Sequence, residues 1–398
     1  MGRWGQYGGA VLSWLSPSAR LALWYTLAIG SLGALHPFLA RTLAARGATP
    51  GAIAGILTLF PIGFLSAGVI WGYLTDRSPH PARWLRAASC VAAVASCLAA
   101  WTDSWVVLMV AFALLAFSRA PMVPLVDALT VAALGEGGAG YGRVRMWGSV
   151  CFAAMVFGVG AQIDAVVDSP LVVNALLLSL CALWTFTLPA APIETRLAGL
   201  GELKRLLHQK KVAVVIGVGG LLGVMHATYD FLFSLYLEGL GASTSYATAA
   251  FIGGLTVEVT VMGSSSWLLK RLGAVGMMRL ALWTAIPRFL ITGAADEVLW
   301  IVAAQFTHGI TFGAFWMGAV SWLSENVAPQ ARNSAQSALM ATAAGLGPLI
   351  MLSGATVVDA VDSLKTLFLF ASGVAVVATL WFSVTFRATP KENQGGAR

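Results

Sequence analysis

Eight ionisable residues stand within stretches of the sequence that are otherwise apolar. They are His36, Arg119, Asp127, His226, Asp230, Glu258, Arg288 and His308. An ionisable side chain inside a lipid bilayer is costly unless it is paired or hydrated, so each is a candidate functional position. Guanidinium groups hold carboxylates and phosphates through paired hydrogen bonds, and imidazole groups exchange protons near neutral pH. The set therefore indicates anion binding and proton transfer within a membrane.

Arg119 lies near the middle of its apolar stretch, too far from either end for its side chain to reach water easily. Asp127 follows two turns later and about 80° around the helix, so a direct ion pair with Arg119 would be strained. An arginine without a dedicated partner suits a bidentate site for a substrate carboxylate or phosphate. The alternative is a buried ion pair with Asp230 or Glu258.

Asp127 and Arg145 are each nine residues from Glu136, which lies in a Gly-rich turn. Antiparallel helices of equal rise place two such residues at the same depth, so the spacing predicts an ion pair across the hairpin. This pair either locks the hairpin or senses substrate near the floor of a cavity.

His36 and His226 occupy matching positions, after Leu-Gly-Ala-Leu in one place and Leu-Gly-Val-Met in the other. Each is either a satisfied interior residue or part of a central site, where its imidazole could carry a proton. Pro37 follows His36 directly, removes a backbone hydrogen bond and is expected to loosen the helix there.

Glu258, Arg288 and His308 come to similar depths if their three helices form successive hairpins. An acid, a fixed cation and an imidazole make a plausible proton relay, and the alternative is a static buried salt bridge. Asp230 is the second candidate for carrying the coupling proton.

The composition requires that these residues sit in membrane helices. Of the 398 residues, 58% are apolar and 10% are charged, whereas soluble domains carry about 25% charged residues. A bilayer core of ~30 Å needs about 20 apolar residues per helix. The sequence predicts an all-α membrane protein with twelve transmembrane helices. They are 20–44, 50–74, 84–101, 104–132, 142–163, 170–189, 212–238, 243–268, 275–294, 298–324, 332–357 and 364–386.

The basic residues predict the orientation. Of the 24 Lys and Arg residues, three (Arg41, Arg46 and Lys365) fall on one side of the predicted membrane and two (Arg119 and Arg288) within it. The other nineteen share a side with both termini. Cytoplasmic loops are enriched in Lys and Arg, so both termini are expected in the cytoplasm. The net charge of +7 therefore reflects topology, and we expect no nucleic-acid partner.

The longest polar connection divides the chain into two halves of six helices each. We expect an N-terminal half at 1–189, a cytoplasmic loop at 190–211, a C-terminal half at 212–387 and a disordered tail at 388–398. Short matches between the halves at offsets of 189 to 194 residues favour a parallel duplication.

Several motifs resemble a known transporter family. The loop Gly72-Tyr-Leu-Thr-Asp76-Arg77 resembles the signature loop of the major facilitator superfamily. The strings PLVDAL at 124–129, YGRVRMWG at 141–148 and TYD at 228–230, with Glu258, Arg288 and His308, are similar to the phenylpropionate permease group and the related lactose/proton symporter. This resemblance implies the major facilitator fold, proton symport by two rocking halves, and a bacterial inner membrane.

The sequence departs from the lactose symporter at three places. Phe152 replaces a sugar-stacking Trp, Thr311 replaces a carboxylate, and no lysine in the eleventh predicted helix can pair with Asp230. Galactoside recognition is therefore not expected, and Phe152 becomes a candidate wall for another substrate. The other candidate aromatic walls are Tyr25, Tyr229, Trp283, Phe315 and Trp316.

These observations together predict a proton-coupled symporter for a small organic anion such as an aromatic carboxylate. The substrate would be bound by Arg119, His36, His226, Asp127, Arg145 and Phe152. The proton would be carried by Glu258, Arg288, His308 and Asp230. The alternatives are a symporter of a neutral sugar or nucleoside, or an efflux carrier of the same fold. No nucleophile motif, metal cluster or Walker loop points to an enzyme or an ATP-driven pump. We expect a monomer in the lipid bilayer, driven by the proton gradient without a cofactor.

Overall fold

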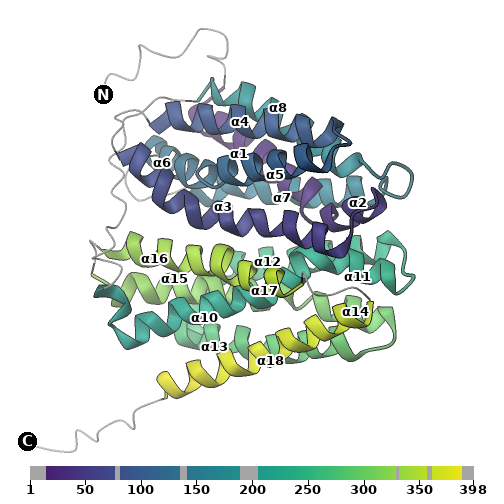
Figure 1. The fold of residues 1–398 in the computed structure, drawn as a ribbon. Helices are drawn as coiled ribbons and strands as arrows, with labels where there is room; N and C mark the ends of the chain where they lie inside the picture. The colour runs from purple at the N-terminus through teal and green to yellow at the C-terminus, as the bar shows by residue number, and fades with distance from the viewer. Residues whose placement is uncertain are drawn as a thin grey trace, which may run out of the picture.

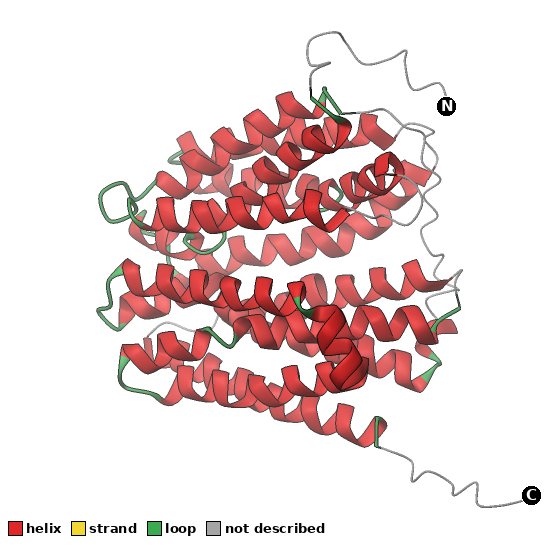
Figure 2. Cartoon of the chain, turned by 180° about the vertical axis from the view of Figure 1, so that it is seen from behind, coloured by secondary structure: helices red, strands yellow, loops and turns green. Residues whose placement is uncertain are grey.

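Helix is the only regular structure in the residues that the computed structural model describes, which are 15–76, 81–134, 141–188, 205–328, 331–355 and 361–387 (Figure 2). Seven of these helices are long and apolar enough to cross a membrane, or eight if the bent pair Pro17–Leu35 and Leu39–Ala45 is one span. Four shorter apolar helices accompany them at Pro50–Leu65, Val144–Gly160, Ser169–Thr185 and Ala338–Ser353.

A first helix group lies in the upper part of the molecule (Figure 1). It contains α1 (Pro17–Leu35), α2 (Leu39–Ala45), α3 (Pro50–Asp76), α4 (Pro81–Trp101), α5 (Trp105–Arg119), α6 (Met122–Leu134), α7 (Tyr141–Gly160) and α8 (Ser169–Thr185). Of the signature-loop residues, Gly72 and Asp76 fall in the last part of α3, where side chains are not described, and Arg77 lies outside the described residues.

A second helix group lies below the first (Figure 1). It contains α10 (Lys210–Ala227), η2 (Thr228–Leu232), α11 (Phe233–Gly239), α12 (Thr244–Gly263), α13 (Ser265–Ala294), α14 (Val298–Gln305), η3 (Ile310–Ala314), α15 (Phe315–Asn326), α16 (Arg332–Met340), η5 (Ala341–Leu346), α17 (Gly347–Ala355) and α18 (Val361–Thr385). The described part of the chain leaves out residues 190–204, which are most of the loop predicted at 190–211. It also leaves out the whole predicted tail at 388–398.

Two apolar clusters form the core, one within each helix group. Val224 and Phe231 of the second group pack into the first cluster. Phe38 and Val156 of the first group pack into the second cluster. The two groups are therefore joined by direct apolar contact as well as by the chain.

The long predicted helices contain breaks. The first helix bends by 47° between Leu35 and Leu39, which confirms the weakness expected at Pro37. The predicted helix 104–132 corresponds to one candidate span, Trp105–Asp127, in which a short turn at 120–121 separates α5, ending at Arg119, from α6, beginning at Met122. α13 begins ten residues before the predicted 275 and changes direction at Gly273, whose φ is 69°.

Three wide π-helical turns interrupt the second group, and sequence periodicity does not reveal them. They are η2, η3 and η5. Such turns insert a residue into a helix, reorient the side chains beside it and often occur at functional sites. Tyr229 and Asp230 lie on η2, and Thr311 lies on η3, so two of the turns carry residues of the candidate site.

Two glycines 190 residues apart, Gly33 and Gly223, allow close helix packing in the two groups. A Cβ on Gly33 would lie 2.5 Å from the backbone oxygen of Phe152 in α7. A Cβ on Gly223 would collide with the backbone oxygen of Ala343 in η5. A backbone atom cannot move aside as a side chain can, so only glycine fits at both positions.

We expect Gly33→Ala and Gly223→Ala each to destabilise the protein by about 1–3 kcal/mol, the usual cost of overpacking. Thermal unfolding of the purified variants in detergent measures this. Gly158→Ala is the matched control, because it lies in a membrane helix with no atom within 4 Å of the added Cβ. An unchanged melting temperature for both test variants would contradict the packing described here.

Candidate functional site

Arg288 of α13 is the most deeply buried charge among the described residues, with 1% of its surface exposed. Its Nε donates to Oε1 of Gln305 at 3.0 Å, and its Nη1 donates to Oγ1 of Thr311 at 2.9 Å. Nη1 also lies 3.2 Å from Nε2 of His226. Polar atoms from three helices therefore hold this guanidinium, and no carboxylate of the described residues contacts it.

Two aromatic rings enclose the same guanidinium. Its central carbon lies 4.6 Å from the ring centre of Tyr229 and 4.7 Å from that of Phe289, distances typical of cation–π contacts. Nη2 is buried and has no hydrogen-bond partner in the described part of the chain. A buried donor without an acceptor is costly, so this atom offers a hydrogen bond to a ligand or to water.

The contacts of His226 define its tautomer. Nδ1 lies 2.9 Å from the carbonyl oxygen of Leu222, which only accepts, so Nδ1 carries the hydrogen. Nε2 then accepts from Nη1 of Arg288. His226 therefore supports Arg288, and the expected grouping of His226 with Arg119 is not what the structure contains.

Glu258 and His308 lie next to each other and link α12 to the helix after α14; the contact is an ion pair only when His308 is protonated. Oε2 of Glu258 lies 3.6 Å from Nε2 of His308, and both side chains are largely buried. Gly309 makes this possible, because a Cβ there would collide with the backbone nitrogen of Glu258. Two members of the predicted relay thus come together.

Arg288 reaches this pair only through intermediates. The ring of Tyr229 contacts both the Arg288 guanidinium and the ring of His308, whose centre is 4.8 Å away. The rings of His226 and His308 are 5.2 Å apart. A direct ion pair of Arg288 with Glu258, the static alternative to the relay, is absent from the described contacts. The guanidinium bonds to Gln305, Thr311 and His226 instead.

Asp230 lies on η2 and is partly exposed. It makes no hydrogen bond or ion pair with any residue that the structure describes, in line with the missing lysine. Its electrostatic neighbours are Arg288 and Glu258.

The first helix group contains the predicted ion pair. Nη1 of Arg145 lies 3.7 Å from Oδ2 of Asp127. Sequence reasoning did not find the third member: the Tyr25 hydroxyl donates to Oδ1 of Asp127 at 2.5 Å. The side chains of Arg145 and Asp127 are 44% and 28% exposed, so the pair is reachable from water.

Arg119 ends α5 and donates only to neutral oxygens. Nη2 lies 2.8 Å from the carbonyl oxygen of Ala28, and Nη1 lies 3.0 Å from Oγ of Ser31 and 3.4 Å from Oδ1 of Asn174. The alternative ion pair with Asp230 or Glu258 is absent from the described contacts. The positive charge of Arg119 is therefore not neutralised by a contacting carboxylate of the described residues.

His36 lies where the two groups meet. Its ring packs against Phe60 and Phe231, with centres 4.9 and 5.4 Å away. Its Nε2 is buried without a hydrogen-bond partner among the described residues, and Arg119 is an electrostatic neighbour.

The candidate aromatic walls divide into inner and outer residues. Phe152 packs against the second cluster and so lies at the contact between the groups. Trp283 is 61% exposed, and its place in a substrate wall stays a prediction. Phe315 is fully buried in the core, while Trp316 is partly buried and stacks on Phe312.

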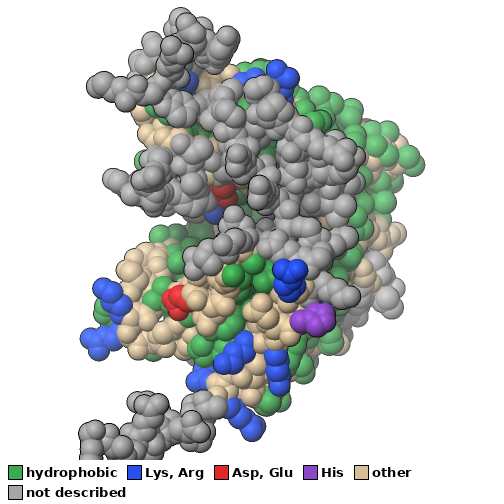
Figure 3. All heavy atoms as spheres, turned by 90° about the vertical axis from the view of Figure 1, so that its left-hand side faces the viewer, with side chains coloured by type: hydrophobic (Ala, Val, Ile, Leu, Met, Phe, Trp, Pro, Cys, Tyr) green, Lys and Arg blue, Asp and Glu red, His purple; other side chains and the backbone are tan. Residues whose placement is uncertain are grey.

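A space-filling view along the bundle shows a hollow between the two groups, with acidic and basic atoms inside it (Figure 3). This hollow opens at the end of the molecule that faces left in Figure 1.

Comparison with known proteins assigns the family. The MFS_1 like family matches residues 18–370. Maltose permease of Geobacillus stearothermophilus is 28% identical over 346 residues, 85% of this chain and 87% of that protein. The probable 3-phenylpropionic acid transporter of Escherichia coli K12 is 28% identical over 322 residues, 76% of this chain and 81% of that protein.

Solved structures show the same fold. The crystal structure of the nucleoside transporter NupG matches 94% of this chain and 100% of its own, with a TM-score of 0.81 at 17% identity. These relatives and neighbours are membrane transporters, not enzymes. The chain described here is an integral membrane protein that belongs to the MFS_1 like family of major facilitator transporters.

Proposed function

We propose that this transporter is a proton-coupled symporter of a small organic anion, such as an aromatic carboxylate. The supporting observation is the charge balance of the candidate site. The site contains three arginines and three carboxylates. The arginines are Arg119, Arg145 and Arg288, and the carboxylates are Asp127, Asp230 and Glu258. Binding one proton to a carboxylate leaves one excess positive charge, and a substrate anion cancels it.

The low dielectric of a membrane protein makes this balance energetically important. An uncompensated charge costs several kcal/mol when it is taken from water into such a medium. A proton and an anion that enter together avoid this cost, so each raises the affinity of the site for the other. The coupling therefore requires no direct contact between the two.

The anion is proposed to bind between Arg119 and His36. Arg119 carries a charge that its three neutral acceptors do not cancel. The buried Nε2 of His36 lacks a partner in the described residues, and a carboxylate would supply one. Asp127, Arg145 and Phe152 complete the proposed binding site, and His226 contributes through Arg288.

The proton is proposed to bind at Glu258 and His308, with Asp230 as the second position. Glu258 and His308 are within 3.6 Å of each other and largely buried. Arg288 lies beside this region, in contact with the Tyr229 ring that also packs on His308, and offers the unfilled Nη2.

The proposed topology has twelve spans in two pseudo-symmetric halves and both termini in the cytoplasm of a bacterial inner membrane. The eight candidate spans and four shorter apolar helices support that number, and the equivalent packing of Gly33 and Gly223 supports the duplication. The three basic residues assigned to the outer side, Arg41, Arg46 and Lys365, are each ion-paired. We propose a monomer with the proton gradient as its only energy source.

A neutral sugar or nucleoside is the second candidate substrate. It is favoured by the relative named maltose permease and by the fold similarity to a nucleoside transporter.

We expect Arg119→Gln to weaken binding of the anion at least tenfold, because the variant loses the uncompensated charge. Thermal shifts of the purified protein with 3-phenylpropionate, benzoate, maltose and uridine measure this. Arg20→Gln is the control, since Arg20 lies near the start of α1 and donates to a backbone carbonyl of Thr187. Binding of maltose or uridine alone, unaffected by Arg119→Gln, would favour the neutral substrate.

We expect Glu258→Gln to abolish the acceleration of uptake by an imposed pH gradient while exchange of labelled for unlabelled substrate continues. The amide cannot release a proton but keeps the shape of the side chain. Proteoliposome uptake and counterflow separate the two activities. Glu325→Gln, at an exposed carboxylate bonded to Ser321, is the control. Uptake by the unmodified protein that ignores the pH gradient would refute proton coupling.

A further inference from the structure

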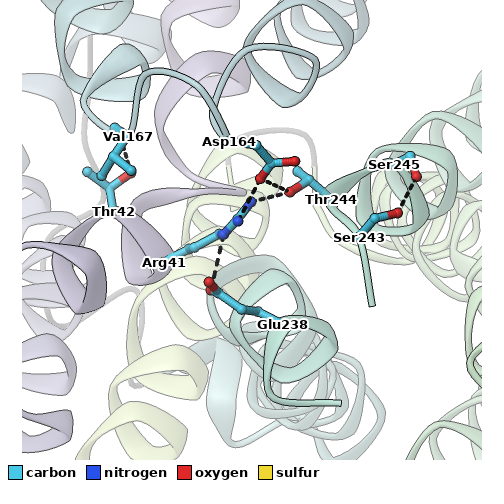
Figure 4. A network of polar contacts seen from close by, with 8 residues as sticks. All are labelled: Arg41, Thr42, Asp164, Val167, Glu238, Ser243, Thr244 and Ser245. Atoms are coloured by element: carbon cyan, nitrogen blue, oxygen red, sulfur yellow. Dashed lines mark hydrogen bonds and ion pairs between the residues drawn. The ribbon is translucent and has the colours of Figure 1, made fainter. Parts of the chain in front are cut away.

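Arg41 of α2 connects the two helix groups at the end of the molecule opposite the hollow. Its Nη2 lies 2.7 Å from Oδ1 of Asp164, in the loop between α7 and α8. Its Nε lies 3.1 Å from Oε2 of Glu238 in α11, and its Nη1 donates to Oγ1 of Thr244, the first residue of α12 (Figure 4). One guanidinium thus holds acceptors from both groups.

A further bond closes three of the four residues, Arg41, Asp164 and Thr244, into a ring, while Glu238 contacts Arg41 alone. The Thr244 hydroxyl donates to Oδ1 of Asp164 at 2.8 Å. The hydrogen bonds from Thr244 and then Arg41 hold the pKa of Asp164 below its usual value. The carboxylate therefore stays ionised at neutral pH, and its contribution is lost only as the pH falls through this lowered pKa.

Close packing continues beneath the ring. The Ser234 hydroxyl of the second group donates to the carbonyl oxygen of Pro37 at 2.5 Å. A Cβ on Gly160 of α7 would collide with the side chain of Thr248 in α12. The groups are therefore in contact here along two pairs of helices, whereas a hollow separates them at the other end (Figure 3).

The sequence explains how Arg41 reaches across. Pro37 lacks a backbone N–H, and the helix bends by 47° between α1 and α2. The bend carries α2 against α11 and η2 of the second group. The Pro37 carbonyl is bonded by Ser234, so the same break supplies both cross-group contacts.

We propose that Arg41, Asp164, Glu238 and Thr244 form a polar clamp that holds the outer end closed and must separate before this end can open. The proposal rests on the orientation and the alternating movement proposed above. Isolated ion pairs on an exposed surface contribute little to stability. The side chain of Arg41, in contrast, is only 18% exposed and has three partners. The clamp therefore stabilises specifically the state in which this end is closed.

Arg46 offers a matched control within the same short stretch of sequence. It pairs with Asp168 at 2.7 Å and donates to carbonyl oxygens of Ala99, Ala100 and Thr102. All these partners belong to the first group. Loss of Arg46 therefore removes a similar ion pair without disconnecting the two groups.

The test measures opening of the outer end by cysteine labelling. The four native cysteines are replaced by serine, and Thr248→Cys provides the reporter, since this residue is 8% exposed and its hydroxyl has no hydrogen-bond partner in the described residues. A membrane-impermeant maleimide is added outside right-side-out vesicles that contain the full chain. We expect Arg41→Gln to raise the labelling rate at least fivefold, and Arg46→Gln to change it less than twofold.

Two further measurements protect the test against a folding defect. Arg41→Glu should also raise the rate, and combining it with Glu238→Arg should bring the rate back towards the starting value. With no clamp substitution, 1 M NaCl should raise the rate, because it shortens the screening length to about 3 Å. An unchanged rate in Arg41→Gln, or an equal rise in Arg46→Gln, would overturn the clamp. The assay uses no substrate, so its result is independent of the proposed anion and proton.

Discussion

A charged group buried in a membrane protein must find its partners inside the protein, and this constraint organises the whole structure. Arg288 obtains acceptors from Gln305, Thr311 and His226. The π-turn η3 carries Thr311, and the tautomer of His226 follows from its bond to the backbone. Arg119 obtains three acceptors, all neutral. Arg288 and Arg119 are thus held in place without a contacting carboxylate among the described residues, so either guanidinium can take an anionic ligand as a partner.

Much of the fold follows from the sequence because the bilayer imposes a length and a composition on each span. Apolar stretches gave the helices, and Pro37 gave the bend in the first one. The π-turns could not be predicted, since one inserted residue shifts the helical phase by about 100° but these helices are apolar on nearly every face, so the shift leaves no visible mark in the sequence. The short turn after Arg119, inside the candidate span Trp105–Asp127, was not predicted although Pro121 and Pro124 follow it. Prolines in membrane helices cause anything from no bend to a full break, depending on their neighbours.

The candidate site was predictable where the partners lie on one hairpin or on adjacent helices. The spacing around Glu136 gave the pair of Asp127 and Arg145, and Glu258 was grouped with His308. Tyr25 was not recognised as a partner of Asp127, because nothing in the sequence links residues 102 positions apart. His226 was grouped with Arg119 through the repeat, but the structure bonds it to Arg288. Symmetry relates positions and does not determine hydrogen bonds.

The first helix connects the proposed anion site with the proposed polar clamp. His36 of the anion site lies at the contact between the two helix groups, and Arg41 of the clamp lies just beyond the bend. The central claim is that a proton and an anion bind together. The direct measurement is proton exchange on ligand addition, followed with a pH indicator in weakly buffered solution of the purified protein. We expect uptake of about one proton for each 3-phenylpropionate or benzoate bound, the stoichiometry that restores charge balance. Anion binding with no change in bound protons would contradict it.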